Sequence, residues 1–343
     1  MWTKEQPTGS LGFGATYSAT TGVGANVSFT ERNFLGRGQT LSFEVATTAD
    51  SGTYSFGFIE PSFLRRDLRF GLNASYAANN TVSNTSYNTV TGIFSPSLEF
   101  PISEFGRFGL RYTLGASEVN SVPASSSAIL AAEEARGLEF SSALGYSYTY
   151  STLDTGLNPD AGVLLRFNQD IAGLGGDYEY IRSTALGVAE KKVLNDDVTV
   201  RAIFEGGAHY SLSGSSKVTD RFNLNNKMRG FDAFGIGPRD LTVVNRDALG
   251  GNYFAVAKFE AEFPLGLPEE YGIRGGVFLD VGSVWGLDVS TGVDDSFHLR
   301  SAAGLSLFWD TPIGPLRFNF SRALQKQSYD IERDFDLTIS TRF

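Results

Sequence analysis

The sequence lacks several residue types and patterns on which common classes of function depend. It has no cysteine, which excludes disulfide bonds and thiolate metal sites. Only two histidines are present, His209 and His298, so histidine metal centres and catalytic triads have few candidates. No apolar run approaches the roughly 18 residues that a membrane-spanning helix needs. The first residues, Met1–Glu5, also lack the apolar segment of a signal peptide.

Positive charge is also in short supply. The chain has 28 Lys and Arg against 38 Asp and Glu, which gives a formal net charge of -10 and a pI of about 4.8. An acidic chain without a basic cluster argues against a nucleic-acid partner. No grouping of metal-binding side chains is visible, so we expect neither a metal nor another cofactor.

Glycine and aromatic residues are abundant, with 39 Gly, 28 Phe and 14 Tyr. This mixture favours strands joined by tight turns. Apolar and polar positions alternate along much of the chain. In residues 252–263, for example, the odd positions are apolar or aromatic, whereas Lys258, Glu260 and Glu262 lie on the opposite face. Residues 127–136 are predicted to form a short surface helix instead.

The strand pattern predicts an all-β fold, a 16-stranded antiparallel transmembrane β-barrel. About sixteen segments alternate apolar and polar residues, and short turns between segments alternate with longer loops. A soluble sandwich or propeller is the alternative. However, Glu, Arg, Asp or Asn occupies the second face of nearly every strand, and a barrel of this size has a lumen too wide to fill with side chains. We find no domain boundary, so residues 1–343 are predicted to be one barrel domain.

The longest polar, turn-rich segment, residues 211–250, contains the sequence Lys227-Met228-Arg229-Gly230-Phe231. Arginine carries a fixed charge on a rigid set of donors, glycine allows close backbone approach, and phenylalanine is an apolar anchor. We therefore predict a long loop that folds into the lumen and places Arg229 against carboxylates. A solvated surface arginine is the alternative.

Several motifs resemble those of BamA-type outer-membrane assembly factors and their POTRA-barrel superfamily. Met228-Arg229-Gly230-Phe231 resembles the family's Val-Arg-Gly-Phe/Tyr loop motif, with Met228 in place of the usual Val. The segments 250–257, 278–285 and 314–318 resemble strands that follow that loop in the family. The resemblance covers the whole chain and is strongest in residues 220–343. The family's periplasmic POTRA domains are not in this chain, so we expect the barrel domain alone.

The resemblance implies partners for the loop motif and a function for the barrel. The family's loop arginine pairs with acidic residues on the barrel wall, which correspond here to Glu260 and Asp280. The implied function is an insertase, without reaction chemistry, that folds β-barrel proteins into the bacterial outer membrane. Its implied partners are outer-membrane lipid, client barrel proteins and, through the missing periplasmic domains, accessory assembly lipoproteins.

In the family, the first and last strands meet at a weak seam. Glycines near the first strand, at Gly9, Gly12 and Gly14, remove side chains that would pack there. We predict that this strand pairs with the last strand through fewer hydrogen bonds than any other neighbours. The last strand contributes Phe335, Leu337, Ile339 and the terminal aromatic Phe343, which resembles the C-terminal signal of outer-membrane barrels. Ordinary barrel closure is the alternative.

Other functions are weighed against this one. A TamA-like or two-partner-secretion translocation pore shares the loop motif, so the sequence separates it poorly from an insertase. A passive porin lacks the motif and its two wall carboxylates. An outer-membrane hydrolase needs a His beside a Ser or an acid, and Gly173–Gly176 opens no helix, which argues against a phosphate loop.

Overall fold

The computed structural model describes most of the chain. The residues that it describes are 8–18, 22–80, 84–153, 161–194, 197–290, 292–311 and 314–342.

Sixteen β-strands are formed by the described residues, together with one α-helix and two short 3-10 helices. The strands are β1 (Gly9–Ser18), β2 (Gly22–Phe34), β3 (Gln39–Thr48), β4 (Ser51–Glu60), β5 (Arg69–Asn79), β6 (Asn88–Pro101), β7 (Gly106–Asn120), β8 (Glu139–Ser151), β9 (Ala161–Gly176), β10 (Tyr180–Val193), β11 (Val198–Ser211), β12 (Tyr253–Pro264), β13 (Ile273–Trp285), β14 (Arg300–Thr311), β15 (Gly314–Gln325) and β16 (Phe335–Arg342). The helices are η1 (Phe63–Arg65), α1 (Ala128–Glu134) and η2 (Glu269–Tyr271).

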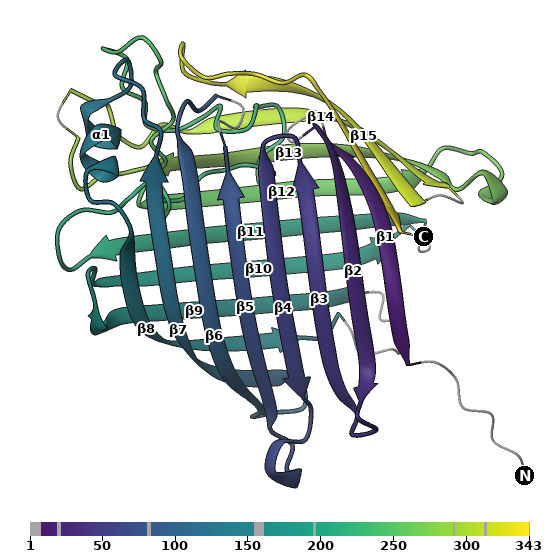
Figure 1. Cartoon of the computed structure of the whole chain (residues 1–343). Coiled ribbons are helices and arrows are strands. Elements are labelled where there is room, and N and C mark those ends of the chain that lie inside the picture. Colours follow the sequence, from purple (N-terminus) through teal and green to yellow (C-terminus); the bar gives the residue numbers. More distant parts are fainter. Residues whose placement is uncertain are drawn as a thin grey trace, which may run out of the picture.

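The strands form one closed antiparallel barrel in sequence order, and β1 pairs with β16 to complete it. The predicted fold class is therefore confirmed. Figure 1 shows β1–β8 as the nearer wall, with α1 at the end where the odd-numbered strands finish. This end also carries the long loop 212–252, whereas the opposite end has short turns such as 35–38. Because outer-membrane barrels carry their longer loops on the cell exterior, we assign the α1 end to the extracellular side.

No described helix is both long and apolar enough to cross a membrane. Helix α1 begins because the Ser127 side chain accepts a hydrogen bond from the Ile129 N–H at 3.3 Å and so caps the helix. The helix lies where residues 127–136 were predicted to be helical. The prediction of a surface helix was only partly right, because Leu130 and Glu133 are buried against neighbouring loops.

Side chains alternate between the outer surface and the lumen along each strand. Among the described residues, the lumen holds no single packed core. Instead, the buried apolar side chains gather in two clusters where loops cover the wall. One cluster joins α1 to the extracellular loops around Leu249, and the other fixes the long loop to β12, β13 and β14. The long loop therefore lies inside the barrel, as predicted.

Candidate functional site

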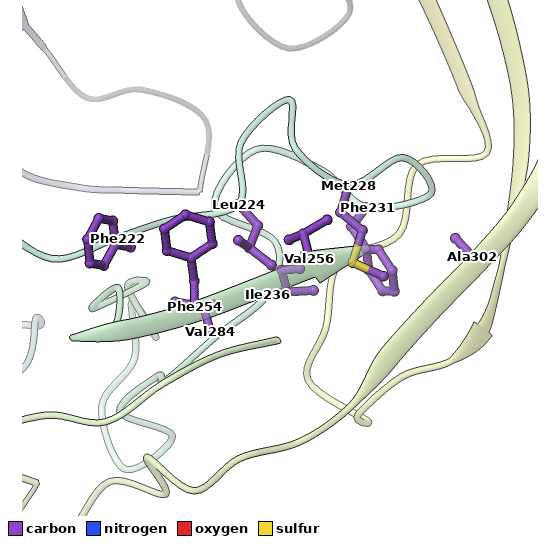
Figure 2. Close-up of a cluster of buried hydrophobic side chains, with 9 residues drawn as sticks. All are labelled: Phe222, Leu224, Met228, Phe231, Ile236, Phe254, Val256, Val284 and Ala302. Carbon is purple, nitrogen blue, oxygen red and sulfur yellow. The ribbon is translucent and has the colours of Figure 1, made fainter. Parts of the chain in front are cut away.

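The long loop enters the lumen along a row of apolar contacts. Its buried apolar side chains meet four residues that project inward from the wall (Figure 2). The loop residues are Phe222, Leu224, Met228, Phe231 and Ile236, and the wall residues are Phe254, Val256, Val284 and Ala302. Burial of several large apolar side chains, each contributing about 1.5–3 kcal/mol, stabilises the docked loop.

Gly230 lies at the closest approach between the loop and β14. Its φ angle is +85°, which L side chains rarely adopt. A Cβ atom at this position would lie 2.6 Å from the Cβ of Ala302. A larger residue would therefore move the loop away from the wall, which explains why glycine is needed between Arg229 and Phe231.

Arg229 forms the polar centre of the site. Its Nε and Nη2 donate to the two carboxylate oxygens of Asp280 at 2.8 and 2.6 Å, and its Nη1 donates to Glu260 Oε2 at 2.5 Å. Its backbone N–H also donates to Asp280 Oδ2 at 3.0 Å. The Asp280 side chain is completely buried, whereas those of Glu260 and Arg229 are 9% and 16% exposed. The arginine thus makes a two-pronged, charge-assisted contact of the strong kind.

The guanidinium is also stacked on an aromatic ring. Its Cζ lies 3.6 Å from the ring centroid of Phe278, which is two residues before Asp280 on β13. A cation above a ring face is attracted by the ring's quadrupole, and the attraction is stronger when water is excluded. In the sequence, Phe278 lies within the segment 278–285 that resembles a strand of the family, and no role was assigned to it. An aromatic residue at a lumen-facing position was the available signal.

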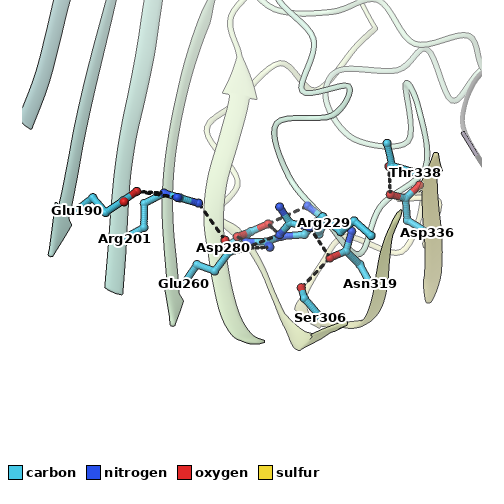
Figure 3. A network of polar contacts seen from close by, with 10 residues as sticks. Glu190, Arg201, Arg229, Glu260, Asp280, Ser306, Asn319, Asp336 and Thr338 are labelled. Carbon is cyan, nitrogen blue, oxygen red and sulfur yellow. Dashed lines mark hydrogen bonds and ion pairs between the residues drawn. The ribbon is translucent and has the colours of Figure 1, made fainter. Parts of the chain in front are cut away.

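Glu260 is shared by three arginines (Figure 3). Besides Arg229, it pairs with Arg317 of β15 and, at 3.5 Å, with Arg201 of β11. Arg201 in turn pairs with Glu190 of β10 at 2.6 Å. This network links four segments of the chain through one carboxylate. The sequence did not identify Arg317 or Arg201. Arg201 lies directly opposite Glu260 in the β11–β12 ladder, so its contact depends on strand register, whereas Arg317 reaches Glu260 from a strand that does not neighbour β12.

A cavity of about 470 Å³ lies beside the network on the lumen side. Arg229, Glu260, Asp280 and also Asp336 and Thr338 of β16 line it. The arrangement consists of buried ion pairs that hold the loop in place.

A second set of contacts fixes the base of the loop near the extracellular end. Arg221 donates to Glu133 of α1 at 2.6 Å, to the Leu249 carbonyl at 2.6 Å and to the Ser216 carbonyl at 2.8 Å. Both charged side chains are almost completely buried. Sequence reasoning missed this pair, since nothing in the spacing of residues 133 and 221 connects them.

The seam between β1 and β16 is short. Five pairs are in register, from Gly14 opposite Arg342 to Ser18 opposite Thr338. The adjacent β15–β16 ladder also has five pairs, from Leu316 opposite Ile339 to Phe320 opposite Phe335. Both ladders of β16 thus have the same number of described pairs, and the prediction that β1 and β16 share fewer hydrogen bonds than any other neighbours stays a prediction.

The predicted seam residues fall in different parts of this arrangement. Gly14 lies within the β1–β16 ladder, whereas no described residue of β16 lies opposite Gly12. Phe335 packs against Phe320 on the outer surface, with ring centroids 5.2 Å apart. Leu337 pairs with Phe318, and Ile339 pairs with residues of both neighbouring strands. Phe343 lies outside the described residues.

Comparisons with known proteins agree with this architecture. The family model described as the Omp85 superfamily domain matches residues 33–343. The outer membrane protein assembly factor BamA of Neorickettsia risticii is 32% identical over 94% of this chain and 43% of its own length. The chain thus spans less than half the length of this relative.

Solved structures share the fold. BamA from Haemophilus ducreyi lacking POTRA domains 1–3 aligns with a TM-score of 0.82 at 22% identity, covering 99% of this chain and 71% of that one. CdiB from Acinetobacter baumannii aligns with a TM-score of 0.65 at 14% identity, covering 98% of this chain and 60% of that one. At these identities the structures support the architecture alone.

Proposed function

Because the chain belongs to the Omp85 superfamily, we propose that it is the barrel of a BamA-type assembly factor that inserts client β-barrel proteins into the membrane. The chain is a bacterial outer-membrane barrel. Its proposed partners are outer-membrane lipid, client barrels and accessory lipoproteins that bind outside the barrel. It acts without making or breaking covalent bonds.

One observation supports this function most directly. The described residues of β1 and β16 form five pairs in register, whereas those of β10 and β11 form fourteen. A strand edge that separates from its partner is a template for another strand. Lipid offers backbone groups no hydrogen-bond partner, so an edge released from this short ladder is satisfied best by an incoming strand.

The docked loop favours opening between β1 and β16 over passage through the lumen. The loop motif occupies the lumen beside β13 and β14, so a passage straight through the barrel is obstructed. The seam has five pairs, whereas β1 and β2 have ten. Separation of β1 from β16 therefore breaks fewer hydrogen bonds than separation of β1 from β2, and the client can pair with the exposed edge while lipid is still excluded.

A cross-link across the seam tests the proposal. Positions 15 and 341 lie opposite each other in the ladder, and the chain has no cysteine of its own. We expect full-length protein with Ala15→Cys and Thr341→Cys, once joined by a short thiol cross-linker, to remain folded and to lose client insertion. A cross-link between positions 11 and 29, which pair in the β1–β2 ladder, is the matched control and should leave insertion intact.

The same experiment separates the alternative function. A verified cross-link at the seam that leaves client insertion at its full rate would contradict the insertase. A two-partner-secretion or TamA-like export pore would then be favoured, because export through the lumen needs the loop to leave rather than the seam to part. A steady, large ionic conductance through the unmodified barrel would favour a passive porin instead.

A further inference from the structure

The segment between β15 and β16, residues 326–334, contacts the loop motif as well as the strands that it joins. Phe231 and Glu332 form an antiparallel β-bridge. The Arg333 N–H donates to the Gly230 carbonyl at 3.2 Å. The residues that dock on the barrel wall are thus joined by backbone contacts to the residues that lead into the seam strand.

The contact continues beyond the loop motif. The Asp232 N–H donates to the Ile331 carbonyl at 2.9 Å, and the Ile331 N–H donates to the Gly235 carbonyl at 3.0 Å. Two backbone segments that are about a hundred residues apart in sequence are therefore held as a short two-stranded ribbon. Such a ribbon moves as one unit, because sliding one side breaks all of its hydrogen bonds together.

Arg333 ties this ribbon to the seam strand by charge. Its guanidinium pairs with Asp232 of the long loop and lies 3.8 Å from Asp336 of β16. The Arg333 side chain is only 15% exposed. One cation thus joins a carboxylate of the loop to a carboxylate of the strand whose release opens the seam.

The far side of the same segment is anchored separately. Arg300 of β14 pairs with Asp330 at 3.0 Å, and both side chains are completely buried. Arg300 also donates to the Tyr329 hydroxyl at 3.3 Å. Loss of the Arg333 side chain therefore leaves the segment attached to the barrel, and its effect is confined to the side that faces the loop and β16.

We propose that Arg333 and Asp232 couple docking of the loop motif to closure of the seam, so that the two events occur together. When the motif is docked, Gly230 and Asp232 hold residues 331–333 and thereby set where β16 begins. When the motif leaves the wall, the ribbon moves with it and β16 loses that support. Arg333 is thus a positioning residue for the seam. Its role in assembly rests on the proposed function, whereas the coupling itself does not.

Seam closure can be measured without any client. In full-length protein carrying Ala15→Cys and Thr341→Cys, the rate of cross-linking reports how often β1 and β16 are paired. We expect Arg333→Ala to lower this rate by about fivefold or more, the lower end of the range typical of coupled sites. Arg333→Lys keeps the charge and should restore most of the rate.

The chain offers a matched control in the same segment. Lys326 pairs with Glu332, and their side chains are 44% and 35% exposed. Lys326→Ala should leave the cross-linking rate unchanged, because neither partner reaches β16. If Arg333→Ala cross-links at the wild-type rate, or if Lys326→Ala lowers the rate equally, the coupling is wrong. Should Arg333→Ala fail to fold, Asp232→Asn removes the same ion pair and carries the same expectation.

Client insertion, assayed on the same variants, separates the two proposals. A lowered cross-linking rate with unchanged insertion would support the coupling and contradict lateral opening as the route of insertion. An unchanged cross-linking rate contradicts the coupling, whatever the insertion assay shows.

Discussion

Two parts of the barrel wall are built from the same alternating pattern and yet have opposite inner faces. Strands β3, β4 and β5 carry no buried residue along their length. We call them the bare wall. Strands β12, β13 and β14 bury several inward side chains beneath the long loop, and we call them the covered wall.

The difference lies in the residues that face the lumen. On the bare wall they are small or polar, such as Ser42, Gly57 and Asn73, so water can satisfy them. On the covered wall they include Phe254, Val256 and Phe278, which water does not satisfy. Apolar residues on the inner face therefore mark where a loop docks, beside the charged residues Glu260 and Asp280 that pair with the loop.

The largest effect is expected where charge is buried on the covered wall. Asp280→Ala leaves Arg229 with one of its two carboxylates in a dry site, so we expect a loss of about 3–5 kcal/mol in the free energy of unfolding, less if water enters. Urea unfolding in lipid vesicles measures the loss. Glu44→Ala on the bare wall should stay within about 0.5 kcal/mol of the parent. Equal losses at both positions would remove the distinction between the walls.

A somewhat smaller effect is expected where the loop approaches the wall most closely. Gly230→Ala combines an unfavourable positive φ with a clash against Ala302, and we expect a loss of about 2–4 kcal/mol. Gly36, in the turn between β2 and β3, has a φ of +70° and open space around it. Gly36→Ala should therefore lower the free energy of unfolding only by the cost of the positive φ angle, without a clash.

A second substitution separates the clash from the backbone strain. Ala302→Gly should make room for the new methyl group and recover at least about 1 kcal/mol of the loss in Gly230→Ala. If Ala302→Gly worsens the double variant additively, the close approach of loop and β14 is not the cause of the loss.

Stacking beneath the guanidinium should contribute less than the ion pairs. Phe278→Leu keeps an apolar side chain but removes the ring under Arg229, and we expect a loss of about 1–2 kcal/mol. Phe259, on the outer surface of β12, is the matched control, because lipid can surround the leucine in Phe259→Leu. The same unfolding assay should show a clearly smaller change there.

The smallest effect is expected for an ion pair outside both walls. In the loop 286–299, a hydrogen bond from His298 lowers the pKa of the Asp294 carboxyl from its ordinary 3.8 to about 2. A depressed carboxyl pKa stabilises the folded protein above pH 3.8, and this contribution disappears as the pH falls towards 2. The Asp294 side chain is 52% exposed and that of His298 is 27% exposed, so solvent screens the pair and His298→Ala should flatten the acid side of the stability profile only slightly. A large change would show that surface pairs matter as much as the covered wall.

The barrel and the wall partners of Arg229 could be predicted from the sequence, whereas contacts between distant loops could not. Alternation predicted the barrel, and the resemblance to the assembly-factor family implied Glu260 and Asp280 as the partners of Arg229. The apolar residues Phe254 and Val256, on the otherwise polar face of β12, are a sequence signal that a loop covers this part of the wall. The contacts of Arg333 with Asp232 were not readable, because they depend on how two distant loops meet in space.

The shared carboxylate of Glu260 bears on how the loop is released. If Arg229 withdraws, Glu260 keeps Arg317 and Arg201 as partners, and Asp280 still faces Lys258 across the β12–β13 ladder. The wall thus keeps other cations beside both carboxylates, so neither Glu260 nor Asp280 is left without a nearby positive charge when the loop leaves. Docking of the loop is therefore both tight and reversible, because the charges on the wall stay compensated until Arg229 returns.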